Sequence, residues 1–200
     1  DEIIIYPGHG AGSACGKNMM KETVDSLGNQ KVVNYALNGK FSKTEFIKEL
    51  TDNLPEPPSY FPSIVKMNQD GYDDIPDILK RSLIDLSPEK FKSSAESNQA
   101  VILDTRDATA FCEAHIPGSL FIGLSGSFAP WVGMLVKGVN QPILIVSDEN
   151  KKQEAIMRLS RVGYDNCIGF LDGGIQSWLS AGFPTAKVDV KLPVEIENSL

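Results

Sequence analysis

Two kinds of hydrophobic patterning divide the chain. Within residues 73–186, short unbroken apolar runs alternate with stretches whose apolar residues recur at helical spacing. An unbroken apolar run is typical of a strand that is buried on both faces, and its alternation with helices predicts a parallel sheet covered by helices. The fold class predicted for this part is therefore α/β. The expected strands are AVILD, SLFIGL, ILIVS and CIGFL, which begin at Ala100, Ser119, Ile143 and Cys167.

Capping residues and glycines mark the helices expected around these strands. Ser87 is a suitable N-cap, and Pro88 suits the first helical position, where an N–H would have no partner. Further helices are expected in RDATAFCEA (106–114), in the amphipathic segment 151–163 and in GIQSWLSAG (174–182). The last two segments end at a glycine, which is the usual residue just after a helix.

Residues 1–72 are patterned differently. The apolar run 2–6 predicts one buried strand, and helical stretches are expected from about residue 17 to residue 38. Ser42 and Glu45 form a capping box ahead of another helix. One strand cannot make a sheet. We therefore expect this region to be the last, mostly helical part of a domain that begins upstream of this sequence.

Composition narrows the function classes. The 200 residues are 42% hydrophobic and 22% charged, as in an ordinary globular protein. No apolar run approaches the roughly 20 residues of a membrane span. The net charge of −7 argues against a nucleic-acid partner, which would require a basic face. Three widely spaced cysteines favour free thiols in a reducing compartment. We therefore expect a cytoplasmic protein that has neither nucleic acid nor membrane as a partner.

The polar segment after ILIVS poses the main chemical question. Side chains at the carboxyl end of a strand, facing the amino terminus of a helix, often carry the chemistry of open α/β proteins. Ser147 occupies that position, yet no evident base stands beside it. A serine enzyme, a disabled cysteine enzyme and a plain turn all fit this pattern. The segment consists of Ser147, Asp148, Glu149, Asn150, Lys151 and Lys152.

Two longer stretches carry a family resemblance. VILDTRDATAFCEAHIPGSLFIGL, from Val101, and FLDGGIQSWLSAGFPT, from Phe170, resemble the two signatures of the rhodanese fold. The resemblance implies a rhodanese-like domain over residues 73–186, in which a parallel sheet carries helices on both faces. Residues 187–200 are then expected to be a linker to a following domain.

Active rhodaneses carry a cysteine where this chain has Ser147. A thiolate needs positive potential around it, and a persulfide needs hydrogen-bond donors. Asp148 and Glu149 would raise the pKa of a thiol placed there, the segment has no arginine, and a serine hydroxyl cannot hold a sulfane sulfur. The resemblance therefore implies a catalytically inactive domain with a structural or binding role. It also gives His115, in HIPG, a structural position.

The first region resembles a second family. PGHGAGSACG, from Pro7, and the following KETVDSLGNQKVVNYAL resemble the metallo-β-lactamase fold, in particular its persulfide dioxygenase branch fused to rhodanese domains. The resemblance covers residues 2–72 and implies the last part of an αββα domain. It makes His9 a metal-site position in the parent protein only. The main ligand motif, HxHxDH, is absent, so no metal is expected on this chain alone. The parent would use Fe(II), or Zn if it is a glyoxalase II-like thioester hydrolase.

The resemblance also implies a substrate and a role for one cysteine. The parent would act on a low-molecular-weight persulfide or thiol, and a homo-oligomer is a further expectation. Cys15 lies among glycines ahead of a helix, a setting that can lower the pKa of a thiol, so it is the candidate sulfur relay of the parent. A small residue that permits close packing is the alternative interpretation. Cys112 and Cys167 are expected to be buried packing residues.

Overall fold

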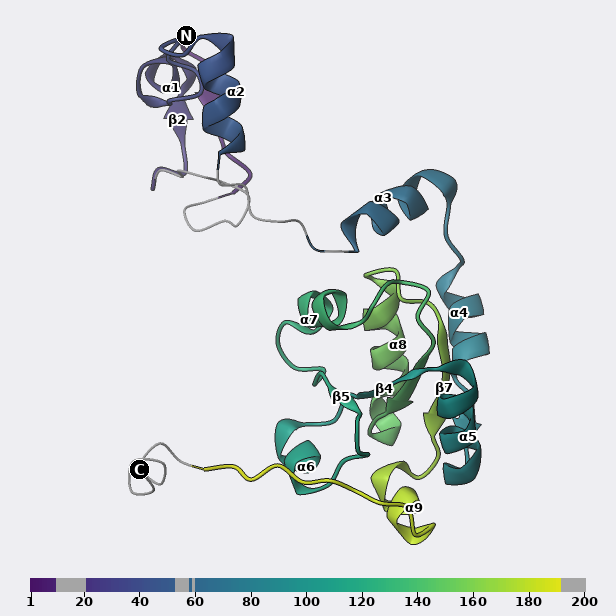
Figure 1. Ribbon diagram of the computed structural model, residues 1–200. Helices are drawn as coiled ribbons and strands as arrows, with labels where there is room; N and C mark the ends of the chain where they lie inside the picture. The colour runs from purple at the N-terminus through teal and green to yellow at the C-terminus, as the bar shows by residue number, and fades with distance from the viewer. Residues whose placement is uncertain (10–20, 53–57, 59, 192–200) are drawn as a thin grey trace. The chain divides into compact units, whose positions relative to one another are not determined.

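The computed structural model describes residues 1–9, 21–52, 58 and 60–191 (Figure 1). The chain forms two compact units, Asp1–Glu56 and Pro57–Leu200. The domain boundary expected between residues 72 and 73 stays a prediction. Within the described residues, none of the helices combines the length and apolar character that crossing a membrane requires.

The described residues of the first unit form two short strands and two helices. β1 (Ile4–Ile5) runs antiparallel to β2 (Asp25–Ser26), and α1 (Leu27–Val33) follows β2 directly. Ser26 marks the transition from strand to helix, because its side chain accepts a hydrogen bond of 3.1 Å from the N–H of Asn29.

α2 (Lys43–Thr51) begins with the capping box that the sequence predicts. The N–H of Glu45 donates to Ser42 Oγ at 3.3 Å, and the N–H of Ser42 donates to Glu45 Oε2 at 2.9 Å. Two amide groups that the helix itself cannot satisfy are therefore bonded.

Two predictions for this unit were wrong in part. The run 2–6 was expected to be a lone buried strand, whereas β1 is shorter, pairs with a second strand and leaves Ile4 52% exposed. Residues 21–26 precede the helix, which begins only at Leu27. No residue in the described part of this unit is buried. The described residues of the unit therefore leave the apolar run largely uncovered.

The second unit is a five-stranded sheet covered by helices. Its strands lie in the order β3-β7-β6-β4-β5, and every neighbouring pair is parallel. The predicted α/β fold with a parallel sheet is thus confirmed. The strands are β3 (Asp85–Leu86), β4 (Val101–Asp104), β5 (Leu120–Phe121), β6 (Ile143–Val146) and β7 (Cys167–Leu171).

Helices cover both faces of this sheet. Buried apolar side chains of α4, α7 and α8 join one hydrophobic cluster, and those of α5 and α9 join the other. The helices of this unit are α3 (Phe61–Asp70), α4 (Ile75–Ser82), α5 (Pro88–Asn98), α6 (Ala108–Glu113), α7 (Phe128–Leu135), α8 (Lys152–Ser160) and α9 (Gly174–Ser180).

Two helices lie where the sequence pattern does not predict them. α4 begins inside DDIPD, which reads as a polar boundary, and it accommodates Pro76 because the first turn of a helix needs no N–H there. α7 has the sequence FAPWVGML, in which Pro130 likewise falls in the first turn. Its almost uniform apolar character hides the helical period. Ile78 of α4 and Val132 of α7 are buried in the core.

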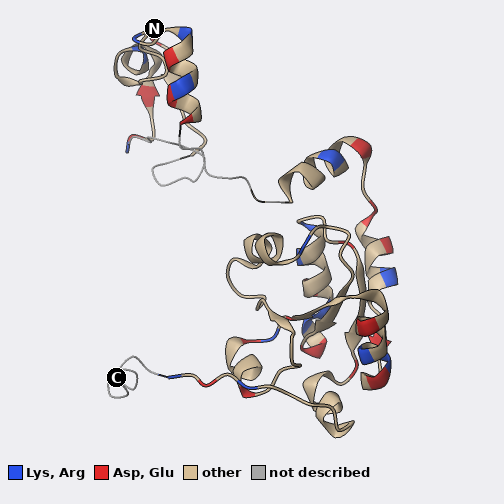
Figure 2. Cartoon of the chain, viewed as in Figure 1, with Lys and Arg blue, Asp and Glu red and all other residues tan. Residues whose placement is uncertain are grey.

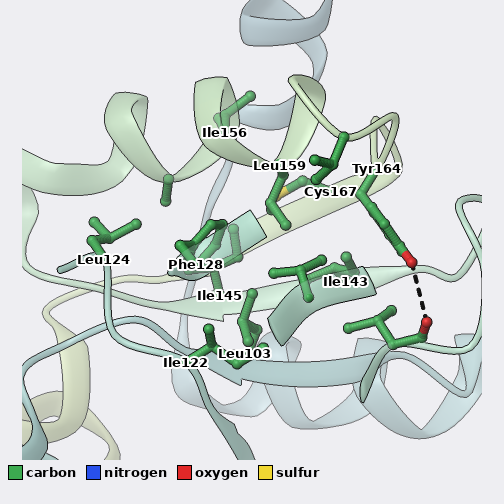
Figure 3. Close-up of a cluster of buried hydrophobic side chains, with 14 of the residues drawn as sticks. Leu103, Ile122, Leu124, Phe128, Ile143, Ile145, Ile156, Leu159, Tyr164 and Cys167 are labelled. Atoms are coloured by element: carbon green, nitrogen blue, oxygen red, sulfur yellow. Dashed lines mark hydrogen bonds between the residues drawn. The ribbon is translucent and has the colours of Figure 1, made fainter. Parts of the chain in front are cut away.

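β6 is the centre of the core. Ile143 and Ile145 belong to the cluster on one face, Leu144 and Val146 belong to the cluster on the other, and all four are 0% exposed. Figure 3 shows the first cluster, where these isoleucines lie near Leu159 of α8. Buried aliphatic side chains of this size contribute about 2 kcal/mol each, so β6 fixes the position of the segment that follows it.

Candidate functional site

Ser147 is placed at the carboxyl edge of the sheet, directly after β6, as the sequence predicts. It is only 6% exposed, and its Oγ donates a hydrogen bond to the carbonyl oxygen of Asp148 at 3.2 Å. No hydrogen bond in the described part of the chain joins Ser147 Oγ to a histidine or lysine. The hydroxyl is therefore occupied by its own backbone rather than activated by a base.

His115 is the histidine of this unit, and its ring contacts Phe111 rather than Ser147. Its Nδ1 lies 2.9 Å from the carbonyl oxygen of Phe111, and the two rings stack with centroids 4.0 Å apart. Its backbone N–H also donates to Ala186 at 3.0 Å. The ring thus has a packing role. The serine-enzyme interpretation loses the one histidine that could have served it.

The segment after Ser147 is a tight turn rather than an open cradle. Glu149–Lys151 form one turn of 3-10 helix, in which the N–H of Lys151 donates to the carbonyl oxygen of Asp148 at 2.9 Å. α8 begins at once with Lys152. A loop that holds a persulfide needs several inward-pointing N–H groups, and here one of them is already used within the turn.

Lys152 is buried by ion pairs instead of facing the loop. Its Nζ lies 2.6 Å from Asp85 Oδ1 and 2.6 Å from Glu149 Oε2, and only 8% of its side chain is exposed. Burial by itself lowers the pKa of Lys152, but hydrogen bonds and charge attraction from Asp85 and Glu149 outweigh it, so the pKa is raised. Asp85 and Glu149 therefore neutralise the charge of Lys152, which is then not available to attract an anion.

The second lysine of the segment is neutralised as well. Lys151 Nζ lies 2.8 Å from Glu154 Oε2, and this bond is the main cause that lowers the pKa of Glu154. Asp148 and Glu149 are exposed. Figure 2 shows Lys and Arg interspersed with Asp and Glu along the helices. The segment offers no net positive potential for a thiolate or an anionic substrate.

The DTR motif holds the neighbouring strand end in place. Arg106 donates through Nη2 to Asp104 Oδ2 at 2.6 Å and to the carbonyl oxygen of Ala114 at 2.8 Å, and both partners of the ion pair are buried. The N–H of Thr105 donates to the carbonyl oxygen of Val146 at 2.9 Å. The bond from Thr105 joins the end of β4 to the end of β6, next to Ser147, and the contacts of Arg106 hold the end of β4 against the residue that follows α6.

His9 lies in the first unit, on the wall of a hollow of about 510 Å³ that also includes Glu22, Asp25 and Gln30. A hydrogen bond from Gln30, followed by one from Asn29, lowers the pKa of Asp25. Among the described residues, no group of three His, Cys, Asp or Glu side chains is arranged to bind a metal ion. The side chains placed here therefore do not fit a tightly held iron or zinc by themselves.

The cysteines differ from one another. Cys167, at the start of β7, is buried, and burial raises the pKa of its thiol to about 12. Cys112 in α6 is half-buried, so the expectation of a fully buried residue was wrong there. Cys15 lies outside the described residues.

Comparison with a family model accounts for the second unit. Residues 87–181 match the family described as rhodanese-like domain. This part of the chain has a rhodanese-like fold. Ser147 and the turn after it lie inside the matched residues, so the fold of this domain is combined here with a serine at the position expected for cysteine.

Three solved structures are similar to parts of this chain. A metallo-beta-lactamase from Staphylococcus aureus subsp. aureus COL is 27% identical, with a TM-score of 0.58 over 84% of this chain and 44% of that one. This chain therefore spans less than half the length of that protein. The rhodanese-like domain of an Anabaena sp. protein is 20% identical, covering 56% of this chain and 84% of its own, with a TM-score of 0.44. A polysulfide-sulfur transferase from Wolinella succinogenes is 15% identical, covering 66% and 94%, with a TM-score of 0.44.

Asp85 is the residue of the rhodanese-like domain's turn region that sequence reasoning missed. It belongs to β3, which contains only two residues and lies parallel to β7. A strand this short leaves no periodic signal. Only the pairing with β7 brings Asp85 to Lys152.

Proposed function

We propose that this chain belongs to a persulfide dioxygenase fused to rhodanese domains, and that its rhodanese-like domain is a structural or binding module without sulfurtransferase activity. One observation carries the second part. Ser147 is buried, its hydroxyl donates to the Asp148 carbonyl, and the turn after it is closed by the ion pairs of Lys152. A sulfur atom carried at this position would have neither a covalent partner nor a cationic surrounding.

The dioxygenase part is supported by two features. The PGH segment carries His9, and the first unit shares the fold likeness to a metallo-beta-lactamase. The reaction proposed for the parent converts a low-molecular-weight persulfide, dioxygen and water into the thiol, sulfite and two protons. Fe(II) would supply the dioxygen chemistry. His9 alone of the described residues stands at a position associated with the metal centre, so no step is assigned to this chain's side chains.

The exposed apolar side chains of the first unit agree with a place inside a larger domain. Ile4, Val32 and Ile47 are each at least half exposed, and no described residue of this unit is buried. Exposed apolar side chains that lie together are typical of a surface that contacts further protein.

A glyoxalase II-like hydrolase is the second candidate for the parent. It would use Zn and a thioester in place of Fe(II) and a persulfide. The same PGH segment supports it, and the upstream ligands distinguish the two.

The sulfurtransferase part is tested with the 200-residue chain. Thiocyanate production from thiosulfate and cyanide should not rise above the uncatalysed rate. The Ser147→Ala variant should give the same rate as the unsubstituted 200-residue chain. Turnover at the level of a cysteine-bearing rhodanese that Ser147→Ala abolishes would overturn this part of the proposal.

The parent activity is tested with the natural full-length protein. Glutathione persulfide and coenzyme A persulfide are supplied in separate reactions, and oxygen consumption is compared with sulfite formation. We expect one molecule of oxygen to be consumed for each sulfite formed. Hydrolysis of a glutathione thioester without oxygen consumption would instead support the hydrolase.

A further inference from the structure

Asn38 and Gly39 form a turn that follows α1 in the first unit, and they are the one Asn-Gly pair in the sequence. Gly39 is exposed and has a φ of +69°, in the left-handed region that favours glycine. Among the described residues, no atom beyond the neighbours of Gly39 lies within 4 Å of a Cβ added there. The backbone nitrogen of Gly39 is therefore free of crowding by a side chain of its own or of another residue.

Hydrogen bonds hold Asn38 at both its backbone and its side chain. Its N–H donates to the carbonyl oxygen of Asn34 at 2.9 Å, which anchors it to the end of α1. Its Oδ1 accepts a hydrogen bond of 3.1 Å from the N–H of Lys40. This second bond closes a ring whose members include Asn38 Cγ and the Gly39 nitrogen. The side-chain carbonyl carbon of Asn38 is therefore folded back towards the nitrogen of the next residue.

Two groups at this turn are left unbound. Within the described part of the chain, neither Asn38 Nδ2 nor the N–H of Gly39 forms a hydrogen bond. An N–H that donates elsewhere must give up its bond before its nitrogen can attack, and a side-chain amide that is held must be released before it can leave. Neither step is needed here. The N–H of Lys40 already points at the oxygen on which negative charge would develop during an attack on Asn38 Cγ.

We propose that Asn38 is a self-modification site, at which the folded chain converts asparagine into aspartate and isoaspartate. The Gly39 nitrogen gives its proton to hydroxide and bonds to Asn38 Cγ. The bond from Cγ to Nδ2 then breaks, and Nδ2 takes a proton from water and leaves as ammonia. Water opens the resulting succinimide ring. Opening at Cγ gives aspartate, and opening at the main-chain carbonyl carbon gives isoaspartate, whose backbone runs through Cγ.

Asn34 forms the same kind of turn but lacks the features that favour the reaction. Its Oδ1 accepts a hydrogen bond of 3.0 Å from the N–H of Ala36. Its Nδ2, however, donates to Gln30 Oε1 at 2.9 Å, so the leaving amide is held. The next residue is Tyr35, whose side chain crowds the nitrogen that would attack. Asn34 is therefore expected to remain unchanged while Asn38 is converted.

Asp70 and Gly71 could form the same succinimide ring, and the structure protects them. The N–H of Gly71 donates to the carbonyl oxygen of Met67 at 2.9 Å. Lys66 Nζ lies 2.7 Å from Asp70 Oδ2. A bonded amide is a poor nucleophile and a paired carboxylate is a poor electrophile, so isomerisation of Asp70 is expected to be slow. A glycine after the acid or amide is therefore not sufficient, and the hydrogen bonds decide which pair reacts.

The modification would change the wall of the hollow that includes His9. Leu37, the residue before Asn38, lines this hollow of about 510 Å³. Both products add a negative charge directly after Leu37, and isoaspartate also lengthens the main chain by one methylene group. The turn that ends at Lys40 is then built on a different backbone.

The test incubates the 200-residue chain and a synthetic peptide of residues 35–43 at pH 7 and at pH 8. Peptide mapping by mass spectrometry follows each asparagine, and chromatography separates the isoaspartate product. We expect Asn38 to convert first, at a rate at least equal to that in the peptide, because the turn already holds the ring-forming atoms together. The rate should be higher at pH 8, since the Gly39 nitrogen attacks after it has lost its proton.

Two variants separate this site from its neighbours. In Asn38→Gln the longer side chain must form a larger ring, so conversion at position 38 should fall at least about tenfold. Asn34→Gln is the matched control, and Asn38 in this variant should convert at the rate of the unsubstituted chain.

Several outcomes would overturn the proposal. Faster conversion in the peptide than in the chain would mean that the fold protects Asn38. Conversion of Asn34, or isomerisation of Asp70, at the rate of Asn38 would mean that the hydrogen bonds do not select the site. An equal rate at position 38 in Asn38→Gln would exclude the ring closure. If that variant does not fold, the comparison of Asn38 with Asn34 in the unsubstituted chain decides, because it needs no substitution.

Discussion

Lys152 and Asp85 stand 67 positions apart in the sequence, yet Nζ of Lys152 lies 2.6 Å from Oδ1 of Asp85 at the carboxyl edge of the sheet. Glu149 approaches the same nitrogen at 2.6 Å. The contacts tie the start of α8 to β3. They also hold the turn after Ser147 against the edge of the sheet.

Replacing Lys152 should therefore destabilise the domain. Lys152→Met leaves Asp85 without its partner, but this carboxylate is 50% exposed and can hydrate, so we expect a loss of about 1–2 kcal/mol in the free energy of unfolding. Lys151→Met removes an exposed pair and should cost less than about 0.5 kcal/mol. Urea unfolding of both variants measures the difference. Equal losses would show that the burial of Lys152 adds nothing.

Ser147→Cys should not create a sulfurtransferase. The new thiol would lie beside a closed turn with acidic residues and without arginine, so neither thiolate nor persulfide is stabilised. We expect thiocyanate formation at least about 100-fold slower than in a cysteine-bearing rhodanese, the size of effect that missing donors have in other active sites. A rate within tenfold of such an enzyme would contradict the account of the turn.

Stability should fall at alkaline pH because of Cys167. Burial raises the pKa of this thiol from 9.0 to about 12, so the folded chain holds the proton more tightly than the unfolded chain. Its contribution is fully present below pH 9 and is lost as the pH rises towards 12. The free energy of unfolding should decrease by up to about 1.4 kcal/mol per pH unit in this range.

The control for this effect is Cys167→Ala, whose unfolding should depend less steeply on pH. Burial also raises the pKa of Tyr164, so some dependence should remain in the variant. If the free energy of unfolding falls equally steeply with pH in the variant and in the unsubstituted chain, Cys167 is not the cause. Iodoacetamide at pH 7 should leave Cys167 unmodified, and Cys15 is expected to react first.

Arg106 should be among the most sensitive positions of the domain. Arg106→Ala leaves Asp104, which is 0% exposed, as an unpaired buried carboxylate, and we expect a loss of about 3–5 kcal/mol. Lys66→Ala breaks an exposed pair with Asp70 and should cost less than about 1 kcal/mol. Thermal unfolding compares the two, and similar melting temperatures would contradict the structural role of the DTR motif.

The parallel sheet could be predicted because its long strands carry local signals. β6 is an unbroken apolar run, and the capping residue Ser87 marks the helix before β4. β3 could not be predicted, because its two residues are held by bonds to β7. The N–H of Phe170 donates to Ile84 at 2.8 Å, and that of Asp172 donates to Leu86 at 2.9 Å. β3 is therefore a strand only because it forms hydrogen bonds with β7.

The position of the candidate site could be predicted from the sequence, but its burial and ion pairs could not. Ser147 could be located because functional sites of open α/β sheets lie at the carboxyl ends of the strands. The burial of Lys152 depends on Asp85, which lies 67 positions earlier in the sequence. This contact joins distant segments of the chain, so it leaves no signal in the local sequence.

The contrast between the two units predicts how the chain responds to hydrogen exchange and proteolysis. The amides of β6 lie in a core where its four side chains are 0% exposed, so they should exchange only through global opening. The described residues of the first unit have no buried member, so α1 and α2 should exchange through small local openings. A protease at limiting concentration should therefore digest this unit while the sheet remains intact.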